Sequence, residues 1–231
     1  MPAVSEEIVH VKGFPKKLII FLHGYIDNCE GLNHRIVSML ADMNDVAIHL
    51  PEAPVNCEIY AGKRQWYSMH RFDPDDERKT VPTLEECTNI YASMSKGFDE
   101  SYHYLAEYIE NCLNEYQLDA QDLFLCGFSQ GAMLALYTAL RYPEQIGGCV
   151  SFSGILATPN YFYKHKHQTP PMLLIHGNAD NLVRYEVLEY SQKHLEQLGC
   201  LVKTYTVEGG QHRITEDGLR QAEDFIKNLS K

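Results

Sequence analysis

A chain of 231 residues, 45% of them hydrophobic and 22% charged, is long enough for one folded domain and too apolar to be disordered. Its formal net charge of −11 repels nucleic-acid phosphates and anionic lipid headgroups. The longest apolar runs, such as residues 18–22, are far too short to cross a bilayer. We therefore expect no nucleic-acid partner and no stable membrane insertion, and the sequence leaves the oligomeric state open.

The seven cysteines are scattered along the chain and form no CxxC pair. Their number is odd, which indicates reduced thiols rather than a disulfide framework or a zinc site. The first residues, MPAVSEEIVHVKG, lack the basic and apolar regions of a signal peptide. We expect a cytoplasmic protein without a metal site.

Short apolar runs alternate with stretches of helical periodicity over most of the chain. In chain order, the expected elements are a strand at 17–22, a helix at about 28–43, a strand at 45–50, a helix at 98–116, a strand at 122–126, a helix at 130–142, strands at 148–153 and 172–176, a helix at 184–198, a strand at 201–207 and a helix at 214–229. The first helix has an apolar side made of Leu32, Ile36, Met39 and Leu40. The repeated strand–helix–strand order predicts an α/β fold, a mostly parallel sheet with helices on both faces.

No linker rich in Gly or Ser divides the sequence, so we expect a single domain over residues 1–231. Its irregular part is a loop-rich excursion at about 51–97, which is rich in proline and charge. Within this excursion, the charged run at 73–79 is typical of a solvated loop.

Residues 127–131 form a GxSxG motif that follows an expected strand and precedes an expected helix. In that context the motif marks a nucleophile elbow, a sharp turn with glycines on either side of the serine. A five-residue pattern also arises by chance, but seldom between a strand and a helix. Ser129 is therefore the candidate nucleophile, and the N-terminus of the following helix favours negative charge beside it.

A serine hydroxyl is a weak nucleophile and needs a base that a third group orients. In this fold the order along the chain is serine, acid, histidine. Asp180 follows the strand at 172–176, at the carboxyl end of the sheet, although a turn or helix-cap role is equally open for it. His212 follows the strand at 201–207, and of the eleven histidines it alone comes after that acid on a loop that follows a strand.

The oxyanion formed in acyl transfer needs two backbone N–H donors. One is expected from Gln130, directly after the nucleophile. The other is expected from Tyr25, in the loop after the first buried strand. His23, at the start of that loop, is expected to make a structural hydrogen bond.

The chain resembles the phospholipase/carboxylesterase family of α/β-hydrolases, which includes the acyl-protein thioesterases, in the segments LHGYID, LPEAPVN, QWYS, CGFSQGAMLALYTAL, HGNADNLV and GGQHRI. The resemblance covers nearly the whole chain. It implies a minimal α/β-hydrolase with Ser129 as nucleophile, Asp180 as acid and His212 as base, and with Tyr25 and Gln130 in the oxyanion positions. It also implies hydrolysis of esters and thioesters of small molecules or acylated proteins through an acyl-enzyme, with no metal or organic cofactor.

The chain departs from the family pattern near the expected pocket. Tyr25-Ile26 replaces the usual Leu-Gly, and Asn178 replaces the usual Asp. The stretch at 68–96 is longer than usual and carries little of the family pattern.

The candidate substrate-binding residues are Ile26, Trp66 and Met69. We expect apolar side chains from residues 51–98 to form an acyl channel, and the bulky Tyr25-Ile26 pair to limit it to uncharged or weakly polar acyl groups of intermediate length. A lysophospholipase, a lactonase or a catalytically silent binding protein could also share the fold, although the complete triad argues against the last of these. The sequence leaves the natural substrate and the choice between ester and thioester open.

Overall fold

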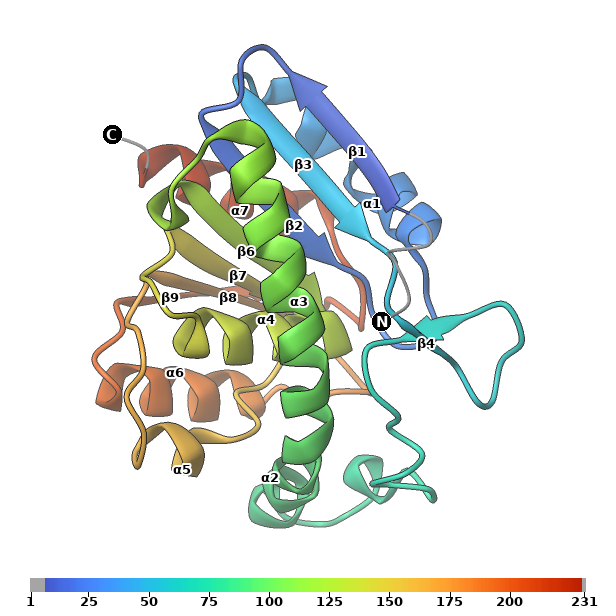
Figure 1. Ribbon diagram of the computed structural model, residues 1–231. Coiled ribbons are helices and arrows are strands. Elements are labelled where there is room, and N and C mark those ends of the chain that lie inside the picture. The colour runs from blue at the N-terminus through green and yellow to red at the C-terminus, as the bar shows by residue number, and fades with distance from the viewer. Residues whose placement is uncertain (1–6, 230–231) are drawn as a thin grey trace.

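A seven-stranded sheet in the order β1-β3-β2-β6-β7-β8-β9 forms the centre of the protein (Figure 1). The computed structural model describes residues 7–229, and over residues 37–42 it describes the backbone alone. The strands of this sheet are β1 (Glu7–Lys12), β2 (Lys17–Leu22), β3 (Val46–Pro51), β6 (Leu123–Phe128), β7 (Gly148–Phe152), β8 (Met172–Gly177) and β9 (Val202–Val207). A separate two-stranded hairpin consists of β4 (Val55–Asn56) and β5 (Arg64–Gln65).

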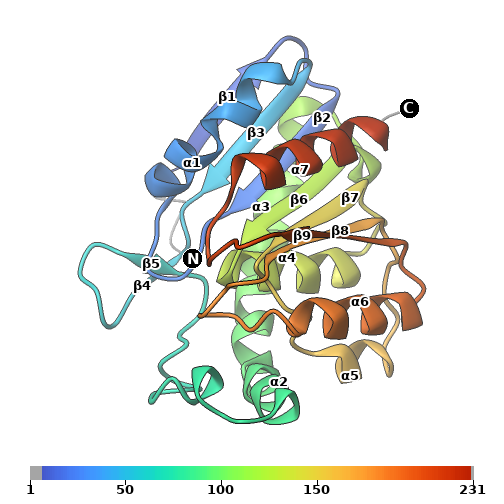
Figure 2. The same cartoon turned by 180° about the vertical axis from the view of Figure 1, so that it is seen from behind.

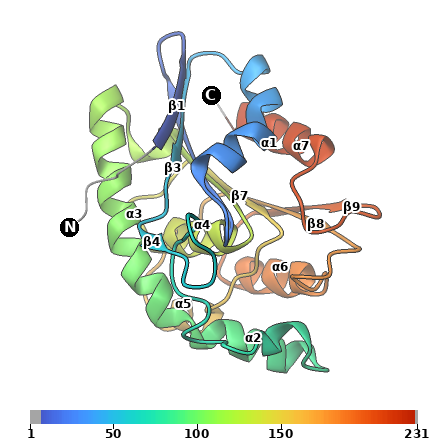
Figure 3. The same ribbon diagram turned by 90° about the vertical axis from the view of Figure 1, so that its right-hand side faces the viewer.

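Helices connect the strands and cover the sheet. They are α1 (Cys29–Asp42), α2 (Leu84–Ser93), α3 (Ser95–Tyr116), α4 (Gln130–Arg141), α5 (Pro159–Phe162), α6 (Val187–Gln197) and α7 (Glu216–Asn228), with short 3-10 turns η1 (Glu77–Lys79) and η2 (Ala120–Asp122). Helices α1 and α7 lie on one face of the sheet, and α3, α4 and α6 lie on the other (Figures 2 and 3).

All neighbouring strands of the large sheet run parallel, except that β1 pairs antiparallel with β3 at one edge. This arrangement confirms the predicted α/β fold. Parallel strands end at the same edge of the sheet, so the segments that follow β2, β6 and β8 meet there. That edge carries the candidate site.

Strand β2 shows why the central strands are apolar along their whole length. Leu18, Ile20 and Leu22 pack into the hydrophobic core beneath α3 and α4, whereas Ile19 and Phe21 pack into the core beneath α1 and α7. All five side chains are fully buried, because successive side chains of a strand point to opposite faces and both faces are covered.

Helix α1 begins one residue after the start we expected. The Asn28 side chain accepts a hydrogen bond from the backbone N–H of Gly31 at 2.8 Å and so caps the helix. Leu32 and Ile36 are buried as expected. Met39 and Leu40 lie outside the described side chains.

The excursion after β3 is more ordered than its composition suggests. It contains the β4–β5 hairpin, which projects from the body of the molecule (Figures 1 and 2), and helix α2. Thr83 and Glu86 form a reciprocal capping box at the start of that helix.

The expectation of a solvated loop at 73–79 is wrong for two of its residues. Asp73 and Arg78 are buried, with relative exposures of 4% and 6%. Their side chains form an ion pair and the carboxylate of Asp73 also accepts a hydrogen bond from the backbone of Glu77, so the charges that suggested solvation bind one another inside the protein.

Candidate active site

Ser129 occupies a strained turn between β6 and α4. Its φ of +53° and ψ of −116° lie outside the helical and strand regions, and its backbone N–H donates to the carbonyl oxygen of Phe152 at 2.9 Å. Such a conformation is uncommon for a residue with a side chain and persists only where the surroundings enforce it. The turn projects from the carboxyl end of β6.

The two glycines of the motif are required by close backbone approach. A Cβ atom on Gly127 would lie 2.4 Å from the carbonyl oxygen of Gly131, and one on Gly131 would lie 2.4 Å from the carbonyl oxygens of Leu22 and His23. Larger residues at either position would push α4 away from β6 and β2. The motif therefore has the mechanical basis that its spacing suggested.

Asp180 and His212 form a hydrogen-bonded pair between the loops that follow β8 and β9. The Nδ1 atom of His212 lies 2.7 Å from Oδ2 of Asp180, whose side chain is fully buried. Because a carboxylate only accepts hydrogen bonds, this contact places a proton on Nδ1. The Nε2 atom of His212 is then the acceptor that a general base requires.

Further hydrogen bonds hold the carboxylate of Asp180 in place. Its Oδ1 atom accepts from the backbone N–H groups of Leu182 and Val183, both at 2.9 Å. The ring of His176, on β8, lies 3.4 Å from Oδ2. Burial by itself disfavours the charged carboxyl, but the hydrogen bonds from His176, His212 and the backbone outweigh it and hold the pKa of Asp180 well below its usual range.

Ser129 and His212 line the same cavity, of about 240 Å³. The ring of Phe128 packs against that of His212 at a centroid distance of 4.8 Å. The candidate pocket residues Ile26 and Met69 also line this cavity, as do Tyr25, Ile59, Tyr60, Asp76, Arg78, Lys79, Tyr91, Met133, Leu182 and Val183.

Trp66 lies away from that cavity. It is 1% exposed, and its indole Nε1–H donates to the carbonyl oxygen of His23 at 2.8 Å. Its backbone N–H donates to the side-chain oxygen of Gln130 at 2.9 Å, and the Gln130 amide donates to the carbonyl oxygen of Tyr67 at 2.8 Å. We expected Trp66 to contact the substrate directly, but it does not line the cavity. Its hydrogen bonds instead connect the loop after β2 with the start of α4.

Tyr25 and Gln130, the two expected oxyanion donors, follow β2 and β6 at the same edge of the sheet. Tyr25 is in the turn that follows β2, and Gln130 is the first residue of α4. Neither backbone N–H donates to another residue within the described part of the chain. The N–H groups of a helix's first turn have no partner within the helix, which makes Gln130 a natural donor to an anion.

The residue after Tyr25 has an unusual backbone. Ile26 has a φ of +58°, in the left-handed region that β-branched residues rarely adopt. Ile26 thus holds a conformation typical of glycine while carrying a bulky side chain.

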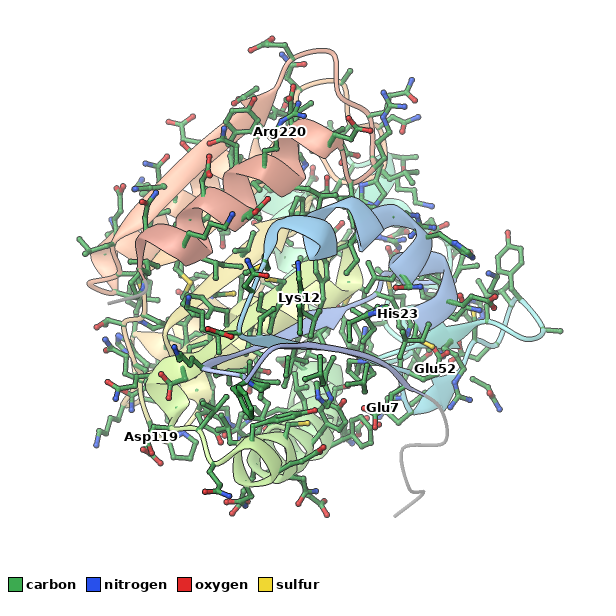
Figure 4. All side chains as sticks on the ribbon, turned by 90° about the horizontal axis from the view of Figure 1, so that it is seen from above. Glu7, Lys12, His23, Glu52, Asp119 and Arg220 are labelled. Carbon is green, nitrogen blue, oxygen red and sulfur yellow. The ribbon has the colours of Figure 1, made fainter. Side chains whose placement is uncertain are left out.

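His23 holds the loop after β2, in which Tyr25 is the expected oxyanion donor, against the segment after β3. Its Nδ1 atom lies 2.8 Å from the carbonyl oxygen of Gly24, and its Nε2 atom accepts from the backbone N–H of Ala53 at 3.1 Å. Glu52 lies beside the ring, with Oε1 at 3.0 Å from Nε2 (Figure 4). His23 is fully buried and has the structural role expected for it.

Comparison with known proteins agrees with this geometry. The sequence model of the phospholipase/carboxylesterase family matches residues 4–230. The chain belongs to this family. Its members are hydrolases of esters and thioesters, so the chain is a serine hydrolase with the α/β-hydrolase fold.

Several relatives match this family member over most of their length. The acyl-protein thioesterase 1 of Candida albicans is 27% identical over 93% of this chain and 92% of its own. The carboxylesterase SOBER1 of Arabidopsis thaliana is 24% identical over 94% of this chain and 92% of its own. Among solved structures, esterase PE8 is 26% identical and superimposes with a TM-score of 0.82, covering 96% of this chain and 97% of that one.

Three further features of this family member concern metal binding, membrane insertion and its thiols. Among the described side chains, which leave out residues 37–42, no group of three or more His, Cys, Asp or Glu is arranged to hold a metal ion. None of the helices within residues 7–229 is both long and apolar enough to span a membrane. All seven cysteines are buried free thiols.

Proposed function

We propose that the protein hydrolyses carboxylic esters and thioesters through an acyl-enzyme formed on Ser129. The observation that carries this proposal is the Asp180–His212 pair, which opens into the same cavity as a serine held in a strained elbow. Ser129 lies in a strained turn, His212 has a proton held on Nδ1, and Asp180 is kept charged by its hydrogen bonds.

In the first half of the reaction, the Oγ atom of Ser129 attacks the acyl carbonyl carbon while His212 Nε2 takes the hydroxyl proton. Asp180 keeps the other imidazole proton on Nδ1 and stabilises the imidazolium. The backbone N–H groups of Tyr25 and Gln130 donate to the tetrahedral oxyanion, at about 3 kcal/mol of transition-state stabilisation for each donor. The C–O or C–S bond then breaks, and the imidazolium gives its proton to the leaving alcohol or thiol.

In the second half of the reaction, a water molecule takes the place of the leaving alcohol or thiol. His212 removes a proton from the water as its oxygen attacks the acyl carbon of the ester on Ser129. Collapse of the second tetrahedral intermediate releases the carboxylic acid and returns the proton to Ser129 Oγ. The cycle needs only the chain's own residues and water.

The cavity suits an acyl group of limited length. Its volume of about 240 Å³ is below the roughly 300–1,000 Å³ that is usual for small-molecule sites. Met133 and Tyr91, which are almost fully buried, line it. We infer that the substrate is a short to medium acyl ester or thioester, of a small molecule or of an acylated protein, met in the cytoplasm where free thiols persist.

The experiment is a series of p-nitrophenyl esters from acetate to palmitate, with one matched thioester, assayed on the wild type and on Ser129→Ala. Each buried methylene is worth about 0.8 kcal/mol, so kcat/KM should rise by at most a few hundredfold from acetate to about six carbons and then fall. Ser129→Ala should abolish turnover. The proposal would be overturned if the wild type hydrolysed none of the esters, or if Ser129→Ala hydrolysed them at the rate of the wild type.

A further inference from the structure

The catalytic cavity contains charged side chains that hydrolysis of an apolar ester does not need. Asp76, Arg78 and Lys79 line it together with Ser129 and His212. They come from the segment around η1, in the stretch where the chain departs from the family pattern. Their placement bears on the kind of acyl group that the cavity accepts.

Arg78 is built into the wall of the cavity. Its Nη1 atom forms a hydrogen-bonded ion pair with Asp73, whose side chain is only 2% exposed. Oδ1 of Asp73 accepts from the backbone N–H of Glu77 at 2.7 Å, so the same carboxylate fixes both the guanidinium and the turn that carries it. The buried ring of Tyr91, which also lines the cavity, lies beside the guanidinium. Arg78 is therefore held in one position rather than extended into solvent.

Asp76 contacts the same guanidinium from the solvent side. Its side chain is 53% exposed, and it bridges Nη1 of Arg78 at 2.6 Å and Nζ of Lys79 at 2.8 Å. One exposed carboxylate thus lies between two cations that line the cavity. A carboxylate of a bound molecule has the charge and geometry to compete with it, because arginine and lysine both donate to such groups.

Tyr25 also lines the cavity. Its hydroxyl is buried and has no hydrogen-bond partner within the described residues. Burial, with the neighbouring Cys57 thiol, raises the pKa of Tyr25, so the hydroxyl keeps its proton. A buried donor without an acceptor is unfavourable, and a ligand oxygen within its reach would satisfy it.

We propose that the cavity binds an acyl group that carries an anionic group, such as a carboxylate, a few atoms from the scissile carbonyl, with Arg78 and Lys79 as its counter-ions. We assign the anion to the acyl half of the substrate because the leaving group must escape to solvent, whereas Arg78 and Tyr91 are almost fully buried. This inference rests on the proposed function and replaces the expectation of an uncharged acyl group. The small volume of the cavity places the anion within a few atoms of the carbonyl.

The test compares two esters of one alcohol, 4-methylumbelliferyl butyrate and 4-methylumbelliferyl hemisuccinate. Both acyl groups have four carbons, and only the hemisuccinate ends in a carboxylate. Rates are corrected for the background measured with Ser129→Ala. In the wild type, kcat/KM for the hemisuccinate should be about 10 to 100 times that for the butyrate, the range expected for hydrogen bonds to a charged group.

Three substitutions should move this ratio in known directions. Lys79→Gln and Arg78→Gln should each lower it several-fold, whereas Asp76→Asn removes the competing carboxylate and should raise it. Arg78→Gln leaves Asp73 buried without its partner and could fail to fold. In that case, Lys79→Gln and Asp76→Asn are sufficient to test the proposal. Lys203→Gln removes one exposed positive charge on β9, away from the cavity, and should leave the ratio unchanged.

A wild-type ratio at or below one would overturn the anion subsite, as would a ratio that Lys79→Gln and Asp76→Asn leave unchanged. In either case, continued hydrolysis of the butyrate that depends on Ser129 would leave the proposed function intact. Loss of the proposed function has a different signature, since neither ester would then be turned over above the Ser129→Ala background.

Discussion

Asp180 accepts hydrogen bonds from His212 and two backbone N–H groups at a place where burial alone would favour the neutral carboxyl. Its partners therefore determine both its charge and its orientation. The position of Asp180 after Ser129 in the chain, in the loop that follows β8, was enough to predict it as the acid. The contact with His176 was not predicted, because a strand residue and a loop residue four positions later face each other only if the loop folds back on the strand end.

Asp180→Asn should leave the fold intact and lower kcat by about 10⁴-fold, the loss seen when the histidine tautomer of a triad is no longer held. The measurement is steady-state turnover of a p-nitrophenyl ester by the purified variant. Asp217→Asn is the matched control, because Asp217 is an exposed partner of Arg220 on α7. If Asp217→Asn removed activity and Asp180→Asn retained most of it, the acid would be misassigned.

The lowered pKa of Asp180 also has a consequence for stability. A carboxyl whose folded-state pKa lies below its unfolded value near 3.9 stabilises the protein above that value, and this contribution is lost as the pH falls toward the folded-state pKa. The unfolding free energy of the wild type should therefore exceed that of Asp180→Asn most at neutral pH, and the difference should shrink below about pH 4. Urea unfolding at several pH values measures it, and a difference that grew on acidification would contradict the assignment.

At the scale of the elements, the site depends on the junction between the loop after β2, the segment after β5 and the start of α4. Trp66 and Gln130 join these three by hydrogen bonds to His23 and Tyr67. The sequence indicated each segment separately. Their connection is a tertiary contact between residues 43 to 64 positions apart, which local periodicity does not encode.

Trp66→Phe tests this junction. It keeps an aromatic ring but leaves the carbonyl oxygen of His23 without its donor. The unfolding free energy should fall by about 1–3 kcal/mol, the usual cost of an unsatisfied buried polar group. Chemical denaturation of the two proteins gives the difference. Unchanged stability would mean that the indole hydrogen bond does not support the oxyanion loop.

The loop after β2 offers a second test, through Ile26. Its left-handed backbone costs about 1–2 kcal/mol for a residue with a side chain, and that side chain lines the cavity. Ile26→Gly should keep the turn and widen the cavity, so octanoate esters should gain in kcat/KM relative to butyrate esters. Val55→Ala, in the exposed hairpin strand outside the cavity, is the control. An octanoate-to-butyrate ratio equal to that of the wild type would show that Ile26 does not limit the acyl site.

Most of the regular elements were predictable, and the exceptions have physical reasons. The predicted elements, which are β2, β3, β6 to β9, α1, α3, α4, α6 and α7, are strongly periodic, and most of their bounds differ from the expected ones by a few residues. The hairpin strands β4 and β5 and the helix α5 are too short to show a period. Strand β1 is a largely exposed edge strand with a charged residue at each end, so it lacks the apolar run of a central strand. Helix α2 lies among prolines and charges that masked it, although the spacing of Thr83 and Glu86 was a readable capping signal.

At the scale of the whole molecule, one parallel sheet brings residues from distant parts of the chain to a common edge. Ser129, Asp180 and His212 follow β6, β8 and β9, and Tyr25 follows β2. Because each residue of the candidate triad follows a different strand, the order of the strands along the chain fixes the order of serine, acid and histidine. Sequence order was therefore enough to select the three residues. The lining of the cavity was less predictable, because the burial of Arg78 accompanies its ion pairs with Asp73 and Asp76.

Covalent labelling identifies the nucleophile. The intact protein is incubated with a fluorophosphonate, and the modified residue is located by peptide mass spectrometry. We expect one adduct per chain, on Ser129, with loss of ester hydrolysis in proportion to labelling and no adduct on Ser129→Ala. An adduct on a different residue that accompanies the loss of activity, or full labelling of Ser129 without any loss of hydrolysis, would contradict the account.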